Sequence, residues 1–319
     1  MILSFVIPCY GSEKTITNVI NEINLVVSAS EHNYEIVLVN DSSPDGVIEV
    51  IKKLALVNKK IKVLDLARNF GQHSALMAGY AHTSGDIIIS LDDDGQIPVN
   101  EVFNLITKLD EGYDVVIARY LDKKHNVFRN LGSYINDIMA QVLIGKPKDL
   151  YLSSFFVAKR FVINEMINYK NSYPYISGLL LRTTNKIANV DVTHRARGIG
   201  KSGYTFGKLL SLWINGFTAF SVKPLRISIS LGAIFAVIGF VVGIYTVINK
   251  FLNPNVPLGW SSTTALLSFL GGIILIVLGM IGEYVGRIYI SINNSPQYVI
   301  REKFNIVEWE DNNNENRRI

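Results

Sequence analysis

The pattern of the first 195 residues predicts an α/β fold, in which a mainly parallel β-sheet carries helices on both faces. Short apolar runs rich in β-branched residues recur along this stretch, and segments with helical periodicity lie between them, which is typical of parallel sheets. The first run lacks the length and the basic flank of a signal peptide, so we interpret it as a strand. The predicted strands are 2–8, 34–39, 61–66, 86–91 and 113–118. Ligands of such sheets bind beyond the carboxyl ends of the strands, so chemistry is expected in the loops that follow them.

Two long apolar runs in the C-terminal third predict a pair of transmembrane helices. Residues 227–248 contain no charged side chain, and neither do residues 261–281. At 1.5 Å per residue, about 20 such residues cross a hydrocarbon core of roughly 30 Å. The connection between the runs is short and contains Pro254 and Pro257. The two spans are therefore predicted to form a hairpin, in agreement with the mean hydropathy of +0.25.

The segment before the first span predicts an amphipathic helix. In residues 205–220, apolar side chains recur at i, i+3, i+4, i+7, i+8 and i+11, which gives one apolar stripe. Such a helix packs on the domain core or lies flat in the membrane interface, and its position just before a span favours the interface. The predicted organisation is an α/β domain at 1–204, an interfacial helix at 205–222, transmembrane helices at 227–249 and 261–285, and a C-terminal segment and tail at 286–319.

The charges predict on which side of the membrane these parts lie. Basic residues flank the predicted hairpin at Lys223, Arg226 and Arg287, whereas its loop contains only Lys250. The positive-inside rule then places both flanks and the α/β domain in the cytoplasm, so the chain is expected to be a multi-pass protein of the inner membrane. The single cysteine, Cys9, excludes a disulfide framework. A net charge of +4 suits an anionic substrate or leaflet and is too small to indicate nucleic acid.

Three consecutive carboxylates follow the fourth predicted strand, at Asp92, Asp93 and Asp94, and Gln96 comes shortly after them. Like charges this close repel one another, and a bound cation offsets that repulsion. Oxygen ligands suit a hard cation, Mg²⁺ or Mn²⁺, which completes its shell with water and phosphate oxygens, so a diphosphate substrate is implied. The alternative is a solvated acidic turn or a helix N-cap, but the position after a buried strand favours the metal site.

Polar residues also follow the first two predicted strands. Tyr10 and Glu13 come after the first strand, and Asp41 with Ser42 comes after the second. A carboxylate at this position can accept hydrogen bonds from a ribose or a nucleobase. Helix capping and turn chemistry are the alternative for Asp41 and Ser42, and the local pattern alone favours that alternative.

An ordered set of motifs resembles glycosyltransferase family 2. The motifs are IPCYGSEKTI, VLVNDSSPDG, ARNFGQHSALMAGYAHTSGDIIISLDDDGQIP, VIARY and RARGIGKSGYTFGKLL, followed by the predicted hairpin. Within the family, the chain is similar to the polyprenyl-phosphate glycosyltransferases, including the bactoprenol glucosyltransferases, the undecaprenyl-phosphate aminoarabinose-type transferases and, more distantly, dolichol-phosphate mannose synthase. The resemblance covers residues 3 to 302 in collinear order. It implies a GT-A fold, a Rossmann-like sheet with a DXD metal motif, for the catalytic domain 1–204.

The resemblance also implies roles for individual residues. The metal ligands would be Asp92, Asp94 and Gln96. The residues that bind the nucleotide-sugar would be Pro8, Tyr10, Glu13, Asp41, Asp92 and Asp93. Asp94, Arg119 and Arg129 would be catalytic, and the phosphate groups and the acceptor would be held by Arg129, Arg197, Lys201 and Ser202.

The chain departs from the family pattern at several of these positions. The family usually has two carboxylates where Asn40-Asp41 stands and Asn-Glu where Gly11-Ser12 stands. Its Gly-Glu-Ser-Lys element reads Gly-Lys-Ser-Gly at 200–203, so Lys201 would supply the basic charge from a different place. Asp93 occupies a position that is often small and apolar in the family.

The implied reaction is an inverting transfer of a sugar from a nucleotide-diphosphate donor, a UDP-hexose, to undecaprenyl phosphate or a related polyprenyl phosphate. A phosphate monoester has a second pKa near 6 and is mostly a dianion at pH 7, so it needs no strong general base. His73 and His82 are accordingly expected to be structural or to contact the sugar. Two alternatives stay open: a transferase of this fold that acts on another membrane acceptor, and an inactive membrane adaptor. Family resemblance further implies a homo-oligomer, with a tetramer as one of the expected forms.

Overall fold

The computed structural model describes residues 1–120, 140–141, 144–193, 195, 259–292 and 295–306, with single helical positions between 230 and 252. The described chain divides into two compact units. One comprises 1–136, 146–204 and 296–319, and the other comprises 137–145 and 205–295. The predicted interfacial helix 205–222 lies outside the described residues, and the first predicted span 227–249 lies mostly outside them.

The first unit contains a sheet whose strand order, within the described chain, is β7-β5-β6-β4-β1-β2-β3-β8. The strands are β1 (Ile2–Cys9), β2 (Asn33–Asn40), β3 (Ile61–Leu66), β4 (Ile87–Ser90), β5 (Val115–Tyr120), β6 (Phe156–Lys159), β7 (Ile187–Val192) and β8 (Ile300–Phe304). β1 pairs in parallel with β2 and β4, and only β6 and β8 run against the other strands. All five predicted strands are present, and the predicted mainly parallel α/β sheet is confirmed.

Three strands have no counterpart among the predicted ones, and each has a weak local pattern. β6 has only four residues, and β7 is interrupted by Asn189 and Asp191. β8 reads IREKF and pairs antiparallel with β3 at the edge of the sheet. Charged side chains are common on edge strands, because they oppose pairing with a further strand. β8 lies within the segment 286–319, and it returns the chain to the sheet after the second unit.

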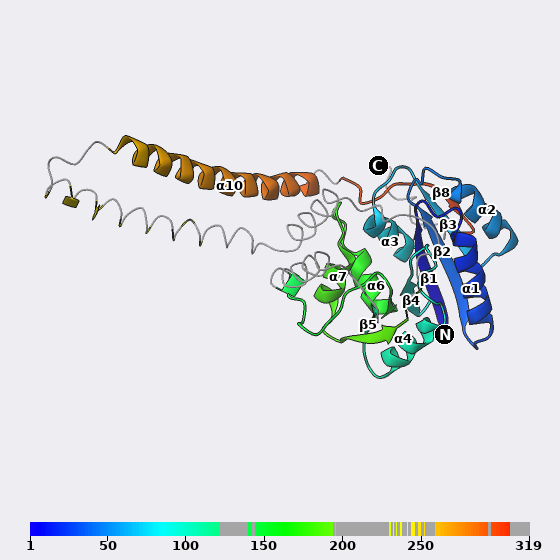
Figure 1. Cartoon of the computed structure of the whole chain (residues 1–319). Helices are drawn as coiled ribbons and strands as arrows, with labels where there is room; N and C mark the ends of the chain where they lie inside the picture. Colours follow the sequence, from blue (N-terminus) through cyan, green and yellow to red (C-terminus); the bar gives the residue numbers. More distant parts are fainter. Residues whose placement is uncertain are drawn as a thin grey trace, which may run out of the picture. The chain divides into compact units, whose positions relative to one another are not determined.

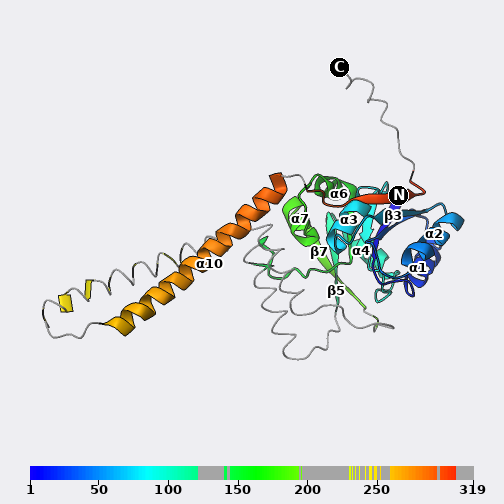
Figure 2. The same cartoon turned by 90° about the horizontal axis from the view of Figure 1, so that it is seen from above.

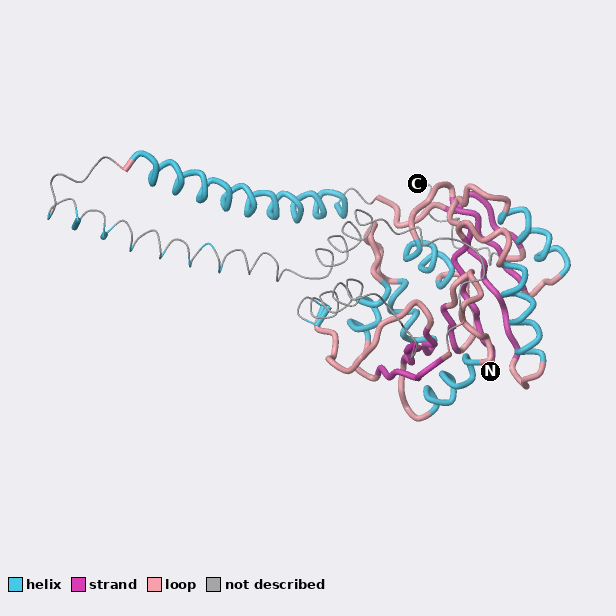
Figure 3. The backbone as a smooth tube through the Cα atoms, viewed as in Figure 1, coloured by secondary structure: helices cyan, strands magenta, loops and turns pink. Residues whose placement is uncertain are grey.

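Helices cover both faces of the sheet, as Figure 1 shows and as the alternation of elements in Figure 3 illustrates. They are α1 (Ile16–Ser28), α2 (Val47–Val57), α3 (Gln72–Tyr80), α4 (Glu101–Asp110), α6 (Arg160–Ile167) and α7 (Ile176–Thr183). α1 and α2 lie side by side on one face (Figure 2). There, alternate residues of β1, such as Phe5 and Ile7, share one core with Ile20 and Ile51 of these helices and with residues of α4.

On the opposite face, α3 packs closely against β1 and β2. Residues 74–80 of α3 are all buried. A Cβ atom added at Gly79 would lie 2.3 Å from Cγ1 of Val6, so only glycine allows this approach. α6 contacts α3 and packs on β4 and β6. α3 begins at Gln72, shortly after the carboxyl end of β3, so its first turn lies at that edge of the sheet.

The second unit contains α10 (Trp260–Ile292), a helix of 33 residues. Its window Phe269–Gly286 has a mean hydropathy of 2.0 and no buried residue, and it is the one helix in the described chain that is long and apolar enough to cross a membrane. At 1.5 Å per residue its length is about 50 Å, more than the roughly 30 Å of a hydrocarbon core. The helix includes the predicted span 261–285 and continues for seven residues beyond it.

Candidate functional site

The acidic triplet lies at the point where the strand order reverses. From β1, the chain builds the sheet outward through β2 and β3 on one side and continues with β4 on the other. The loops that follow β1 and β4 therefore flank a topological switch point, which is where open α/β sheets bind ligands. These two loops touch: the backbone N–H of Tyr10 donates to Oδ2 of Asp93 at 3.0 Å, and Oγ1 of Thr15 donates to the carbonyl of Asp93 at 2.7 Å. Asp93 thus joins the two loops.

Asp92 is the most strongly perturbed carboxylate of the triplet. Burial raises its pKa to about 6, and repulsion from Asp94 and Asp93 adds to this shift. Two hydrogen bonds act in the opposite direction, from Nε2 of Gln72 to Oδ1 at 2.9 Å and from Oγ of Ser154 to Oδ2 at 2.5 Å. Burial also raises the pKa of Asp93. Burial and mutual repulsion thus disfavour the charged form of these adjacent carboxylates. A bound cation would offset that cost.

The residues present fit a hard divalent cation. Asp94 accepts a hydrogen bond from the backbone N–H of Gln96 at 3.1 Å across a turn in which Gly95 has a φ of +70°. Among the described residues, no group of three or more His, Cys, Asp and Glu side chains is arranged to hold a metal. A Mg²⁺-type site does not need one, because it takes one or two carboxylates and completes its shell with water and substrate phosphates. Asp92, Asp94 and Gln96 carry side-chain oxygens of the kind that such a site uses.

Asp41, expected to bind the nucleoside, supports a loop of the site. Its two carboxylate oxygens accept hydrogen bonds from the backbone N–H groups of Phe70 and Gly71 at 2.7 and 2.8 Å. Burial raises the pKa of Asp41, although these two bonds act against the shift. This contact joins the end of β2 to the loop after β3, so it is not the local turn or helix cap that the sequence left open as the alternative. A contact with a nucleoside would be additional to it, through the remaining lone pairs.

The loops after β1 and β2 brace each other. Glu13 donates its N–H to Oδ2 of Asp45 at 2.9 Å and accepts a hydrogen bond from the N–H of Gly46 at 3.1 Å. Oγ of Ser43 accepts the N–H of Gly11 at 2.8 Å. Ser43 and Asp45 were not among the predicted site residues, because the sequence marks them only as part of a turn.

Two other predicted nucleotide-binding residues lie beside this brace. Pro8 is buried in β1, opposite Val39 of β2. The Tyr10 side chain is 54% exposed, so its ring is available to stack on a planar ligand. The predicted nucleotide-binding residues that follow β1 thus gather at the switch point, next to Asp93.

The predicted basic residues are only partly described. Arg119 lies near the end of β5, where its guanidinium forms a two-bond ion pair with the carboxylate of Asp191 on β7. It would have to leave this partner to hold a phosphate. The other four predicted residues of this group lie outside the described part of the chain: Arg129, Arg197, Lys201 and Ser202.

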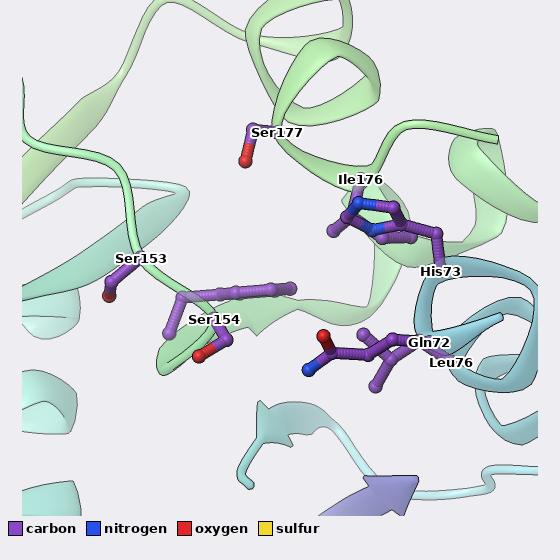
Figure 4. Close-up of a pocket in the computed structure, with 8 residues that line it drawn as sticks. Gln72, His73, Leu76, Ser153, Ser154, Ile176 and Ser177 are labelled. Carbon is purple, nitrogen blue, oxygen red and sulfur yellow. The ribbon is translucent and has the colours of Figure 1, made fainter. Parts of the chain in front are cut away.

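A pocket with a volume of about 80 Å³ lies beside Asp92 (Figure 4). It is lined by the start of α3, by the chain that enters β6 and by the start of α7. The lining residues are Gln72, His73, Leu76, Ser153, Ser154, Phe156, Ile176 and Ser177. Gln72 and Ser154 are the two residues that hydrogen-bond Asp92. Ser153 and Ser154 were not predicted as site residues, because β6, which brings them to the site, was not predicted from the sequence pattern.

Comparisons with known proteins agree over both units. The model of "Glycosyl transferase family 2" matches residues 4–167, and that of "GtrB C-terminal hairpin" matches residues 223–288. The chain is 31% identical over 306 residues to a glycosyltransferase of Bacillus subtilis named YkcC, covering 95% of this chain and 94% of the relative. It is 31% identical over 317 residues to the undecaprenyl-phosphate 4-deoxy-4-formamido-L-arabinose transferase of Photorhabdus laumondii, covering 98% and 97%. The transferase of that name from Klebsiella pneumoniae is 30% identical, covering 94% and 92%.

Solved structures share the fold at lower identity. Mannosyl-3-phosphoglycerate synthase from Rubrobacter xylanophilus is 17% identical, with a TM-score of 0.54, over 70% of this chain and 74% of that one. Glucosyl-3-phosphoglycerate synthase from Mycobacterium tuberculosis, in complex with Mn²⁺ and UDP-glucose, is 20% identical, with a TM-score of 0.50, over 68% and 76%. The α/β sheet is therefore a fold that this chain shares with these two synthases.

Proposed function

The chain belongs to glycosyltransferase family 2, and on this premise we propose that it transfers a sugar, with inversion, from a UDP-hexose to undecaprenyl phosphate at the cytoplasmic face of the membrane. One observation carries the proposal: relatives named as undecaprenyl-phosphate transferases match the chain from the α/β domain through the apolar helix and beyond, over 94–98% of its length. Similarity limited to the α/β domain would give no information about a lipid acceptor. Here the similarity includes the part of the chain that would meet the lipid.

The donor would bind at the switch point between β1 and β4. Asp92, Asp94 and Gln96 would hold a Mg²⁺ or Mn²⁺ ion there, with Asp93 and Tyr10 beside them. Such an ion, when bound, offsets the charge that develops on the departing diphosphate. The chain's own part is to hold these carboxylates in place, through Gln72 and Ser154, before the donor arrives. A structural neighbour was crystallised with Mn²⁺ and UDP-glucose, which supports the proposed cation and the proposed class of donor.

The acceptor phosphate would act as its own nucleophile. Because it is mostly a dianion at pH 7, no side chain needs to remove a proton. The side chains must instead reduce the repulsion between two anionic substrates, a role proposed for Arg119, Arg129, Arg197 and Lys201, with Ser202 as a hydrogen-bond donor. Arg119 would take part after exchanging Asp191 for a phosphate.

The position of β8 supports the proposed transmembrane hairpin. β7 and β8 belong to one sheet, yet residues 205–295 of the second unit separate them in sequence. A chain that leaves an aqueous sheet and returns to it must cross a bilayer an even number of times. If α10 crosses once, a second crossing has to come from the residues before it. The apolar run 227–249 supplies this crossing, within the stretch matched by the hairpin family.

The proposal is tested by supplying membranes that contain the full chain with undecaprenyl phosphate and a panel of labelled UDP- and GDP-linked sugars. The expected product is a sugar-phosphate-lipid that forms only with Mg²⁺ or Mn²⁺ present and that is identified by mass spectrometry. A labelled product on another membrane component, with none on undecaprenyl phosphate, would favour the alternative of a different acceptor. Absence of transfer from every donor in the panel would contradict the proposal.

A further inference from the structure

The pocket beside Asp92 has a lining suited to a neutral polar ligand. None of its eight lining residues carries a full charge: Gln72, His73 and three serines supply polar groups, and Leu76, Ile176 and Phe156 supply apolar surface. Phosphates are usually held by Lys or Arg side chains, and none of the described lining residues is Lys or Arg. Hydroxyl donors and acceptors beside apolar walls match a sugar ring, which has hydroxyl groups at its edge and C–H groups on its faces.

One polar atom of the lining has no hydrogen-bond partner among the described residues. This atom is Nδ1 of His73, which is buried; the ring packs edge-on against Tyr175 with 5.5 Å between ring centroids. Figure 4 shows the imidazole and the Gln72 amide directed toward the space between α3, Ser154 and the start of α7. A buried polar atom without a partner is unfavourable, and native structures rarely retain one without a reason. A ligand hydroxyl would supply the missing hydrogen bond.

The serines of the lining keep capacity for a ligand. Oγ of Ser153 shares its proton between the carbonyls of Ala118 at 2.9 Å and Phe155 at 3.0 Å, and Oγ of Ser154 donates to Asp92. A hydroxyl that donates one hydrogen bond still has lone pairs that accept another. The volume of about 80 Å³ accommodates several water-sized groups at about 10–15 Å³ each, enough for the hydroxyl-bearing edge of a ring.

The pocket is also in the right place relative to the proposed donor. Gln72 and Ser154 line it and simultaneously hold the two oxygens of Asp92. The proposed function puts the donor's diphosphate at the acidic triplet, and the sugar is bonded directly to that diphosphate. The ring must therefore lie within a few bond lengths of the triplet, where this pocket opens.

We propose that this pocket binds the sugar ring of the donor, and that Nδ1 of His73 hydrogen-bonds one of its polar substituents and so selects among sugars. The inference rests on the proposed function, since it needs a nucleotide-sugar at the triplet. A site built to hydrogen-bond a substrate hydroxyl discriminates strongly against analogues that lack it, because its own polar groups are then left unpaired. The pocket thus supplies a means of choosing one donor among those with the same nucleotide.

The test separates binding of the sugar from binding of the nucleotide. The full chain in detergent with Mn²⁺ is titrated with UDP and GDP and with a panel of their hexose, N-acetylhexosamine and pentose conjugates. For His73→Phe, which keeps a ring beside Tyr175, we expect unchanged affinity for the free nucleotide and about tenfold weaker binding of the preferred conjugate. Ser177→Ala, on the α7 side of the pocket, should show the same selective loss and serves if the histidine variant does not fold.

His82→Phe is the matched control. This second histidine lies just past the end of α3, has its Nδ1 2.8 Å from the carbonyl of Ala78 and is not part of the pocket lining. It should alter neither affinity. If His73→Phe and Ser177→Ala weaken nucleotide and conjugate equally, or weaken neither, the pocket inference is wrong while the proposed function stands. If the unsubstituted chain binds none of the nucleotides or conjugates, the proposed function fails and the inference fails with it.

Discussion

Protonation of His73 should make the protein lose stability in mild acid. Burial lowers the pKa of His73 from 6.5 to about 4. A group whose pKa is lowered on folding contributes stability that is fully present above its unfolded pKa and is lost as the pH falls toward its folded pKa. The window is therefore pH 6.5 to 4. Lowering the pKa from 6.5 to about 4 corresponds to roughly 3 kcal/mol of stability.

The measurement compares the full chain with His73→Phe and His73→Gln in detergent, by pulse proteolysis in urea at several pH values. Asp92, whose pKa is raised, changes stability in the opposite direction over an overlapping range, so only the difference between each variant and the unsubstituted chain isolates His73. We expect this difference to shift by about 3 kcal/mol in favour of both variants between pH 7 and 4. A difference that stays constant with pH would refute the reasoning, because it would mean that His73 is as well solvated in the folded as in the unfolded chain.

The remaining predictions concern the metal ligands, the core and the membrane unit. Asp94→Asn should abolish transfer and Mn²⁺-dependent donor binding while the unfolding midpoint is kept; retained transfer would count against this metal ligand. Gly79→Ala should lower the unfolding free energy by about 1–3 kcal/mol, because its Cβ would overlap Val6, and adding Val6→Ala should recover much of that loss; no effect of the first change would mean that α3 is not held against β1. Burial raises the pKa of Glu35, but hydrogen bonds from Lys62, Ser4 and Ser84 outweigh it and lower that pKa. The unsubstituted chain should therefore lose stability below about pH 4.5, and Glu35→Gln should remove that acid sensitivity. The same loss of stability in the variant below this pH would contradict this prediction. Replacing 227–295 with a flexible linker, which keeps β8, should reduce transfer to lipid phosphate far more than donor binding, whereas equal losses would argue against a positioning role of the membrane unit.

The boundaries of that last change show where local pattern is insufficient. By pattern alone, the chain after the second span is a polar segment. A deletion of 227–302 would then be expected to leave the α/β domain intact. The structure pairs β8 with β3. It also sets the guanidinium of Arg301 3.3 Å from the buried Asp65, whose other oxygen accepts Nδ2 of Asn40 at 2.7 Å. Such a deletion would remove Arg301 and expose the edge of β3. It would therefore damage the α/β domain, which contains the proposed donor site, as well as the membrane unit.

The Asp41 carboxylate gives a second example. Its position after a strand is visible in the sequence, and so is its alternative role in a turn. In the structure the carboxylate instead accepts hydrogen bonds from the loop that follows β3. The donors are the backbone N–H groups of Phe70 and Gly71, which lie 29 and 30 positions further along the chain. No periodicity encodes that contact, because it is set by how β2 and β3 align in the sheet.

The sequence by itself determined the strands β1 to β5, the acidic triplet at the end of β4, the long apolar run that becomes α10 and the membership in glycosyltransferase family 2. These features depend on the period of apolar residues and on the order of short motifs, both of which are local properties of the chain. Only the tertiary structure decided that Ser154 and Gln72 hold Asp92 and that Asp191 pairs with Arg119. It also decided that Nδ1 of His73 is buried beside a pocket without a hydrogen bond from any described residue. Those contacts join residues 20 to 72 positions apart, or depend on what surrounds a buried atom. They arise from strand order and helix packing, which fix the distances between distant residues.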